Sequence, residues 1–356
     1  MIINWFSTIG TGKGYSGSSE RIALALNKVA DVRLALFNPD KYKLFTKDAL
    51  KLKEKPFQLG KIGICYSTPV GFSSIINEVK IGYTMWETDK VPVHDKMWGG
   101  GDAIKTINSL DRLFVPCKHN YNLFREYGVK IPIDIVHLGF DPKEYYPLER
   151  TKDRPFTFLM LGKLTMRKNT GAVVTAFLDL FKGNPNARLI LKSQSGIMAH
   201  FEFPEDKNIT IIDRLSTQEE MLGYYKESDC FVLPSRGEGF GLPVLEAMAT
   251  GMPCIFSNHT GLAEMADEKY NYPINNYKKV KANPTMTKSR CDVGNWYDPS
   301  LEELKEKMAY VFKNQSEAKE KGKMAAEWVK NNFTFSHTAK SILNILEKNY
   351  DTTKLH

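Results

Sequence analysis

The sequence predicts an α/β protein built from two doubly wound parallel-sheet domains. Short apolar segments alternate with segments of helical periodicity along the 356 residues, and this alternation is typical of crossover units that form parallel sheets covered by helices. The composition agrees, because 42% hydrophobic and 25% charged residues are usual proportions for globular proteins. A chain of this length can form two domains, each with its own core.

Six segments in the first half and five in the second are predicted to be strands. The first six are Met1–Thr8, Val32–Asn38, Ile62–Ser67, Val79–Met85, Arg112–Cys117 and Ile133–Leu138. The other five are Phe156–Gly162, Ala187–Ser193, Ile209–Asp213, Cys230–Pro234 and Pro253–Ser257. Asp141–Pro155 separates the two series as a proline-containing linker without periodicity. We therefore expect a domain over residues 1–150, a second over 151–333, and a last helix within 334–356 that packs back on the first domain.

A glycine-rich loop at residues 10–17, GTGKGYSG, lies between the first predicted strand and a helical pattern that begins at Ser18. In this setting a G-x-G-x-x-G loop can bind a dinucleotide or simply turn the chain. An ATP phosphate loop is excluded, because Gly14 follows Lys13 where Ser or Thr is required. Dinucleotide binding requires an acidic residue at the end of the next strand, and this requirement is only loosely met because that strand ends in Asn38.

The stretch Cys230–Ala249, CFVLPSRGEGFGLPVLEAMA, predicts a buried strand, a glycine-rich loop and a helix with Pro243 in its first turn. Ligands of parallel sheets bind at the carboxyl ends of strands, where this loop lies. The helix start offers unpaired backbone N–H groups of Phe240, Gly241 and Leu242, which suit a phosphate or diphosphate. A plain turn is the alternative for this loop.

Two carboxylates bracket the expected anion site, Glu238 in the loop and Glu246 in the helix. Carboxylates repel phosphate, so their expected partners are hydroxyl groups, which donate hydrogen bonds to them. A diphosphate between two polyhydroxylated rings fits both requirements, and a sugar nucleotide is such a ligand. The alternative is that Glu246 simply caps or solvates its own helix.

A basic segment supplies cations for a diphosphate. Lys163, Arg167 and Lys168 follow the strand Phe156–Gly162, so we expect them at the same sheet edge as Glu238. Together with the helix start, they can stabilise charge that develops on a departing diphosphate. A solvated basic loop is the alternative.

These motifs resemble those of the retaining glycosyltransferases of GT-B type, specifically the large family 4. The resemblance covers nearly the whole chain, and its hallmark is a glutamate, seven residues and a second glutamate, which Glu238 and Glu246 match. Family members carry a basic pair after a G-R/K strand end, which Arg167 and Lys168 match, with Lys163 where arginine is common. The segments GYTMWETDKVP, DRLFVPCKHN and GNWYDPS resemble one branch of the family.

The resemblance implies a GT-B fold, in which two Rossmann-like domains face a central cleft, the first on the acceptor side and the second binding a nucleoside-diphosphate sugar. It implies that Glu238 binds hydroxyls of the donor sugar, Glu246 the ribose, and the amides of Phe240 and Gly241 the diphosphate. Gly14 resembles a loop glycine that faces the donor phosphates. Members retain the configuration of the anomeric carbon and generally need no metal. We therefore expect no metal site and no cofactor besides the donor substrate, and we expect Glu238 to position the sugar rather than to act as a base.

The acceptor is expected to meet the first domain. Candidate acceptor-binding residues are Trp86, Glu87 and Asp89 in GYTMWETDKVP, and His137 in IVHLGFD. Core packing and structural hydrogen bonding are the alternative roles for these side chains. The expected acceptor is a saccharide, a lipid-linked molecule or a small molecule.

The net charge of +8 leaves a second acceptor class open. Lysines outnumber acids between Lys41 and Lys61, and Lys269–Arg290 contains no acid. Both patches are compatible with a solvated surface, with an anionic membrane or with DNA, in which a hydroxylated modified base would be extruded to receive the sugar. An NAD-dependent oxidoreductase is the alternative of another class, but it uses only the glycines near Gly14 and leaves Glu238 without a role.

No uncharged apolar run reaches the roughly 18 residues of a membrane helix, and the N-terminus lacks a charged leader. A cytoplasmic location is therefore expected. The five cysteines form no C-x-x-C pair, so neither a zinc site nor a disulfide framework is predicted.

Overall fold

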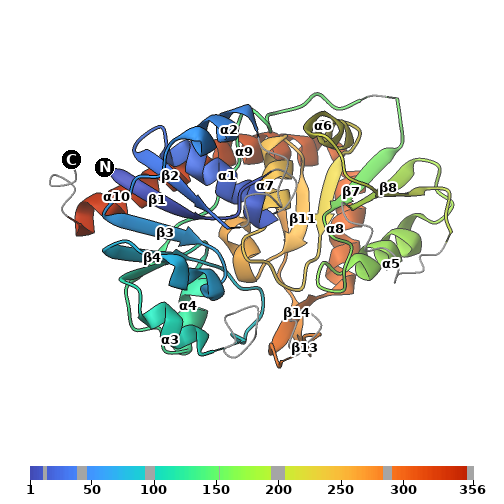
Figure 1. Ribbon diagram of the computed structural model, residues 1–356. Helices are drawn as coiled ribbons and strands as arrows, with labels where there is room; N and C mark the ends of the chain where they lie inside the picture. Colours follow the sequence, from blue (N-terminus) through green and yellow to red (C-terminus); the bar gives the residue numbers. More distant parts are fainter. Residues whose placement is uncertain are drawn as a thin grey trace. The chain divides into compact units, whose positions relative to one another are not determined.

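Two six-stranded parallel sheets form the centres of the two halves of the chain (Figure 1). The computed structural model describes residues 1–10, 14–37, 46–92, 101–151, 153–193, 205–283 and 291–350. Contacts divide the chain into unit 1, Met1–Gly139 with Lys281–Asn295 and Phe333–His356, and unit 2, Phe140–Val280 with Trp296–Asn332. The predicted class, α/β with two parallel sheets, is confirmed.

The sheet of unit 1 has the strand order β2-β1-β3-β4-β5-β6, and every neighbouring pair is parallel. Its strands are β1 (Ile2–Ser7), β2 (Asp31–Leu36), β3 (Ile62–Tyr66), β4 (Val79–Tyr83), β5 (Arg112–Val115) and β6 (Ile133–Ile135). The helices are α1 (Gly14–Leu26), α2 (Lys47–Glu54), α3 (Ala103–Asn108), α4 (Lys118–Glu126) and α10 (Phe335–Asn349), with the 3₁₀ helix η2 (Pro69–Ser74). All six strands predicted in the first half are present.

Helix α1 begins at Gly14, four residues before the predicted start at Ser18. Its first turns contain the buried small residues Ser16, Gly17, Ser18 and Ser19. Oγ of Ser19 accepts a 2.9 Å hydrogen bond from the indole of Trp5 in β1. Oγ of Ser18 donates to the Gly14 carbonyl over 2.6 Å. Residues 14–17 of the predicted glycine loop are therefore helical, and residues 11–13 lie outside the described residues.

Helix α10 belongs to unit 1 and packs against α1, where Figure 1 shows it in red beside the blue helix. Thr334 caps its start in a capping box with His337. Oγ1 of Thr338 donates a 2.8 Å hydrogen bond to the carbonyl of His137. A buried apolar stripe of Ala339, Ile342 and Leu346 completes the contact surface.

The sheet of unit 2 has the strand order β12-β11-β10-β7-β8-β9 and is also parallel. Its strands are β7 (Phe156–Leu161), β8 (Ala187–Ser193), β9 (Ile209–Asp213), β10 (Cys230–Leu233), β11 (Cys254–Ser257) and β12 (Tyr272–Ile274). The helices are α5 (Thr170–Phe181), α6 (Gln218–Lys226), α7 (Leu242–Ala249), α8 (Leu301–Lys313) and α9 (Gln315–Asn332), with the 3₁₀ helix η5 (Thr260–Met265). β13 (Tyr277–Lys281) and β14 (Asn295–Pro299) form a separate two-stranded sheet.

All five strands predicted in the second half are present, but β12, β13 and β14 were not predicted. β12 contains Pro273, which argues against a strand, and the edge position of β12 explains why proline is tolerated. β13 is exposed and rich in lysine, so its sequence has the pattern of a charged surface rather than of a buried strand.

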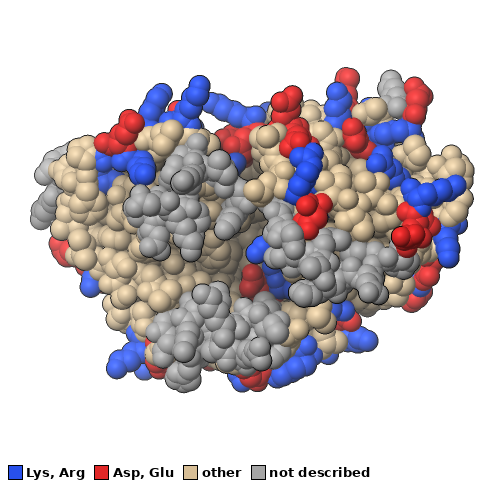
Figure 2. Space-filling model, turned by 45° about the vertical axis from the view of Figure 1, so that its right-hand side comes forward, with Lys and Arg blue, Asp and Glu red and all other residues tan. Residues whose placement is uncertain are grey.

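No helix among the described residues is long and apolar enough to cross a membrane. All five cysteines are free thiols; Cys65, Cys117, Cys230 and Cys254 are buried, and Cys291 is half-buried. On the face shown in Figure 2, Lys and Arg side chains are interspersed with Asp and Glu side chains.

We expect Gly139→Ala to destabilise unit 1. A Cβ atom at this position would lie 2.2 Å from the carbonyl carbon of Thr334, so the start of α10 has to move. Overpacking of this kind lowers the free energy of unfolding by about 2 kcal/mol. Thermal unfolding measures the change, with Gly223→Ala in α6 as the control, because a Cβ atom there meets nothing within 4 Å. Equal melting temperatures for Gly139→Ala and the unchanged protein would contradict this packing.

Candidate functional site

The carboxylate of Glu238 lies buried among three polar side chains of unit 2, and its side chain is 8% exposed. Oε1 lies 2.7 Å from Nζ of Lys168 and accepts a hydrogen bond of 2.6 Å from Oγ of Ser235. Oε2 lies 3.2 Å from Nη1 of Arg167. A buried carboxylate requires counter-charges and hydrogen-bond donors, and these three side chains supply both.

Strand order brings these residues together. β7 and β10 are parallel neighbours, so the loop after β7, which carries Arg167 and Lys168, meets the loop after β10, which carries Glu238. The N–H of Arg236 donates to the carbonyl of Arg167 over 2.7 Å, and the guanidinium of Arg167 donates to the carbonyl of Gly237. The basic pair and the glutamate therefore form one cluster at the carboxyl edge of the sheet.

The two cations determine the ionisation state of Glu238. Burial by itself raises the pKa of this carboxyl group, but the charges of Lys168 and Arg167, with the hydrogen bond from Ser235, lower its pKa to about 2. The group is therefore a carboxylate at neutral pH. It can accept hydrogen bonds from hydroxyl groups, and it has no proton to donate to a leaving group.

The loop continues from Glu238 into the start of α7. Gly241 has φ of +111°, a conformation that favours glycine, and a Cβ atom there would also lie 2.3 Å from Cδ2 of Leu262. Pro243 lies in the first turn of the helix, as predicted. The side chain of Phe240 is buried, which anchors the loop before a helix start, the kind of position that can bind an anion.

Three other residues were predicted to bind the donor. Glu246 is half-buried on α7, and its Oε2 accepts a hydrogen bond of 3.5 Å from the hydroxyl of Tyr225. Lys163 is exposed after β7. Gly14 is the exposed first residue of α1, in unit 1. Their roles in donor binding stay predictions.

Two of the predicted acceptor-binding residues have structural partners in unit 1. The indole N–H of Trp86 donates to Oγ1 of Thr88 over 2.7 Å and to the carbonyl of Lys90 over 2.8 Å. Oδ1 of Asp89 accepts a hydrogen bond of 2.6 Å from the N–H of Asn295. Asn295 is thereby bonded to the loop that follows β4.

His137 also has structural partners, and Glu87 is half-buried on the same loop as Asp89. Nδ1 of His137 lies 2.9 Å from the carbonyl oxygen of Pro116, and its ring lies 5.4 Å from that of Phe333. These contacts account for the positions of Trp86, Asp89 and His137, and acceptor binding by any of the four stays a prediction.

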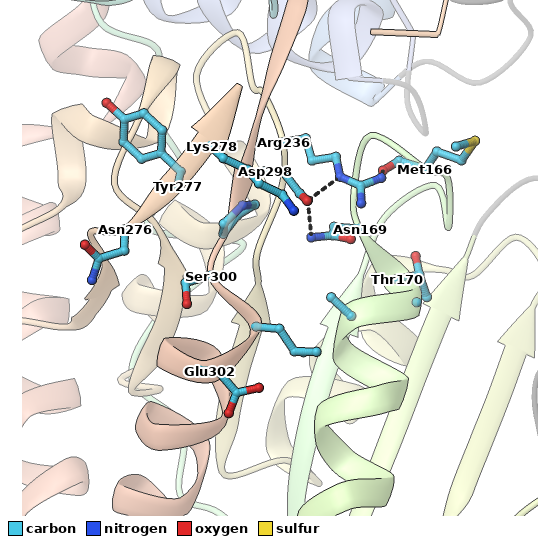
Figure 3. A pocket seen from close by; sticks show the side chains of 14 residues that line it. Met166, Asn169, Thr170, Arg236, Asn276, Tyr277, Lys278, Asp298, Ser300 and Glu302 are labelled. Carbon is cyan, nitrogen blue, oxygen red and sulfur yellow. Dashed lines mark hydrogen bonds and ion pairs between the residues drawn. The ribbon is translucent and has the colours of Figure 1, made fainter. Parts of the chain in front are cut away.

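A second structural pair connects the loop of Glu238 with β14. Nε of Arg236 lies 2.6 Å from Oδ1 of Asp298, which also accepts a hydrogen bond of 3.4 Å from the amide of Asn169. Figure 3 shows these three side chains converging in a cavity of about 760 Å³ between the first turns of α5 and α8. Met166 and Asn169 line this cavity, whereas Arg167 and Lys168 between them do not. The cavity therefore adjoins the cluster at Glu238 without containing it.

Sequence reasoning missed four residues that organise this site: Ser235, Arg236, Thr260 and Asp298. Ser235 donates to the Glu238 carboxylate, and Oγ1 of Thr260 accepts a 3.0 Å hydrogen bond from the Glu238 N–H. The segment GNWYDPS, which contains Asp298, was singled out only for its family resemblance, and no spacing signalled the other three. Among the described ranges, no group of three or more His, Cys, Asp or Glu side chains could hold a metal ion.

Comparison with protein families adds an independent finding. Residues 147–332 match the family described as glycosyl transferases group 1. This range covers more than half of the 356 residues and includes the whole cluster at Glu238.

Curated relatives match part of the chain. Mannosylfructose-phosphate synthase of Agrobacterium fabrum is 29% identical over 168 residues, 39% of this chain and 36% of that protein. The Escherichia coli UDP-Gal:alpha-D-GlcNAc-diphosphoundecaprenol alpha-1,3-galactosyltransferase is 31% identical over 166 residues, 41% of this chain and 42% of that protein. The chain thus spans about two fifths of the length of these relatives.

Solved structures resemble the whole chain. Sucrose-phosphate synthase from Thermosynechococcus elongatus has a TM-score of 0.69 at 16% identity and covers 98% of both chains. Anabaena Alr3699/HepE in complex with UDP-glucose has a TM-score of 0.69 at 12% identity, over 98% of this chain and 100% of that one. At these identities the likeness establishes the fold, and the predicted GT-B architecture is confirmed.

We expect Lys168→Met to destabilise unit 2, because the buried Glu238 carboxylate loses one of its two cations. The loss is about 2 kcal/mol of the free energy of unfolding at pH 7. The folded-state pKa of Glu238 lies below the ordinary value of 4.5, so its stabilising contribution is complete above that value and is lost as pH falls toward 2. The difference in melting temperature between Lys168→Met and the unchanged protein should therefore become smaller from pH 7 to pH 3.

Thermal unfolding over this pH range checks the prediction. The exposed Lys163 supplies the matched control, Lys163→Met, which should melt like the unchanged protein at every pH. A difference for Lys168→Met that stays constant with pH would contradict the role of the ion pair.

Proposed function

The chain belongs to the group 1 glycosyl transferases, and from this premise we propose that it is a retaining glycosyltransferase that moves a sugar from a nucleoside-diphosphate sugar to an acceptor hydroxyl. The observation that carries the proposal is the buried, ionised Glu238 between Lys168 and Arg167, directly before the start of α7. Such a site offers a hydroxyl-binding carboxylate next to an anion-binding helix start and two cations.

Each part of the donor has a matching group in unit 2. The amides of Phe240, Gly241 and Leu242 bind the diphosphate, Glu238 accepts hydrogen bonds from sugar hydroxyls, and Glu246 accepts them from the ribose. HepE, which has the same fold, was solved with UDP-glucose, and the relative from Escherichia coli is named for a UDP-galactose donor. Both names support a sugar nucleotide as the donor class.

Lys168 and Arg167 serve the carboxylate in this structure and the diphosphate in the proposed complex. A diphosphate at the start of α7 brings further negative charge to the cluster, so the two cations become shared between Glu238 and the phosphates. This charge stabilises the departing nucleoside diphosphate electrostatically. Two cationic side chains in this role support a reaction that needs no bound metal.

The proposed reaction proceeds on one face of the sugar. The bond between the anomeric carbon and the phosphate oxygen breaks, and a bond to the acceptor oxygen forms on the same face, so the anomeric configuration is retained. The proton of the acceptor hydroxyl passes to an oxygen of the departing diphosphate. Glu238 contributes orientation of the sugar, because a carboxyl with its pKa lowered to about 2 is a poor base.

A saccharide, lipid-linked or small-molecule acceptor is supported better than DNA. Lys55 pairs with Asp31 over 2.9 Å and Lys61 with Glu78 over 3.5 Å, so part of the first lysine patch is neutralised. The relative from Escherichia coli is named for a diphosphoundecaprenol-linked acceptor. Lys41 to Phe45 and the 284–290 part of the second patch lie outside the described residues.

We expect one nucleoside diphosphate to stabilise the protein in a thermal-shift screen of UDP, GDP, ADP, CDP and NAD. A ligand at a hundred times its Kd stabilises by about 2.7 kcal/mol, which is about 5 °C for a protein of this size. The shift should be the same with magnesium and with EDTA. Glu246→Ala should remove most of it, whereas Glu219→Ala, at an exposed position on α6, should not. A shift with NAD alone, or with no nucleotide, would contradict the donor assignment.

We expect Glu238→Gln to lower turnover about 100-fold through lost orientation of the sugar. Turnover is measured as release of the nucleoside diphosphate from the sugar form of the stabilising nucleotide, first with water as the acceptor. Binding of the nucleoside diphosphate itself should change little, because the amides of α7 remain in place. Glu219→Gln is the matched control, and unchanged turnover in Glu238→Gln would rule out the proposed role.

A further inference from the structure

The end of β11 and the turn that follows it fix the loop of Glu238 through three hydrogen bonds. Oγ of Ser257 donates to the carbonyl of Ser235 over 2.8 Å. The N–H of Glu238 donates to Oγ1 of Thr260 over 3.0 Å, and the N–H of Gly261 donates to the carbonyl of Glu238 over 2.9 Å. Both backbone polar groups of Glu238 are therefore bonded to the Thr260–Gly261 turn.

Thr260 occupies an unfavourable backbone conformation in this turn. Its φ is +52°, in the left-handed region where β-branched residues are genuine outliers. Glycine would adopt this conformation without steric cost. Strained residues of this kind persist only where the surrounding structure over-determines them, and they cluster at functional sites.

The hydroxyl of Thr260 makes two hydrogen bonds that glycine at this position could not make. It donates to the carbonyl of His259 over 2.8 Å and accepts from the N–H of Glu238. Thr260 is 5% exposed and Glu238 is 6% exposed, so water does not readily replace this acceptor. With glycine at position 260, the N–H of Glu238 would be a buried donor without its present partner.

The position of the Glu238 carboxylate depends on how its backbone is held, because the two cations that attract it have flexible side chains. Lys168 and Arg167 attract the carboxylate from the loop after β7, and both have long, flexible side chains that can follow it. The hydrogen bonds from Thr260 and Gly261 act on the backbone instead, and they fix the point from which the carboxylate reaches into the site. A small shift of that point misplaces a hydrogen-bonding group relative to its substrate.

We propose that Thr260 is a positioning residue of the transferase, and that its hydroxyl keeps the Glu238 carboxylate at the place where it meets the hydroxyls of the donor sugar. The inference rests on the proposed function, because it assigns Glu238 to the donor sugar. It adds a residue that contacts no substrate and acts only through Glu238.

Hydrogen exchange tests the structural half of the proposal without any ligand. In Thr260→Gly, the Glu238 amide should exchange at least about tenfold faster than in the unchanged protein, because its acceptor is gone. Thr260→Ser retains the hydroxyl and should exchange like the unchanged protein. Mass spectrometry of overlapping peptides across residues 234–242 provides the readout. Equal exchange at Glu238 in Thr260→Gly and the unchanged protein would overturn the proposal.

Kinetics test the functional half, with release of nucleoside diphosphate from the sugar nucleotide found in the thermal-shift screen. Thr260→Gly should lower kcat about 30-fold, while the Kd of the nucleoside diphosphate stays within about twofold. Thr260→Ser should restore kcat to within about threefold of the unchanged protein. Because Thr260 acts through Glu238, the double variant Thr260→Gly with Glu238→Gln should be no slower than Glu238→Gln alone.

The outcomes separate this inference from the proposed function. If Glu238→Gln is slow but Thr260→Gly is as fast as the unchanged protein, the site assignment holds and the role of Thr260 is wrong. If the double variant is much slower than Glu238→Gln, Thr260 acts independently of the glutamate and the proposal is also wrong. If no sugar nucleotide is turned over, the proposed function fails, and the exchange experiment still decides whether Thr260 fixes Glu238.

Discussion

The burial of one negative charge is the constraint on which the site depends. A carboxylate that is almost fully removed from water needs counter-charges and hydrogen-bond donors in fixed positions, and Glu238 obtains them from Lys168, Arg167 and Ser235. These contacts tie the loop after β7 to the loop after β10. The arrangement keeps the carboxylate ionised and gathers two cations at the loop that precedes α7, and both properties suit a phosphorylated sugar.

Sheet topology makes this arrangement possible. In unit 2 the strands β11, β10 and β7 are neighbours, so three loops that are distant in sequence leave the same edge of the sheet. The loop after β11 supplies Thr260 and Gly261, the loop after β10 supplies Glu238, and the loop after β7 supplies the basic pair. Unit 1 contains a sheet of the same parallel kind, and the likeness to solved GT-B structures extends over both units.

The sequence was sufficient for β1 to β11 and for Glu238 with its two cations, because both depend on local patterns. Buried parallel strands have continuous apolar segments. The spacing of Glu238 and Glu246 can likewise be recognised in the sequence alone. Tertiary context determines what was missed. Pro273 is tolerated only because β12 is an edge strand, and α1 begins at Gly14 rather than at Ser18 in a segment whose Ser16 and Gly17 are buried. Nothing local indicates that Thr260 adopts a left-handed conformation or that its hydroxyl faces Glu238.

The most direct test of the account is a calorimetric comparison of two ligands, the stabilising nucleoside diphosphate and its sugar form, in the unchanged protein and in Glu238→Gln. The account predicts that the unchanged protein binds the sugar form at least about tenfold more tightly than the nucleoside diphosphate, a difference of about 1.4 kcal/mol in binding free energy. In Glu238→Gln that increment should largely vanish while the affinity for the nucleoside diphosphate remains. An equal increment in both proteins would contradict the assignment of Glu238 to the donor sugar.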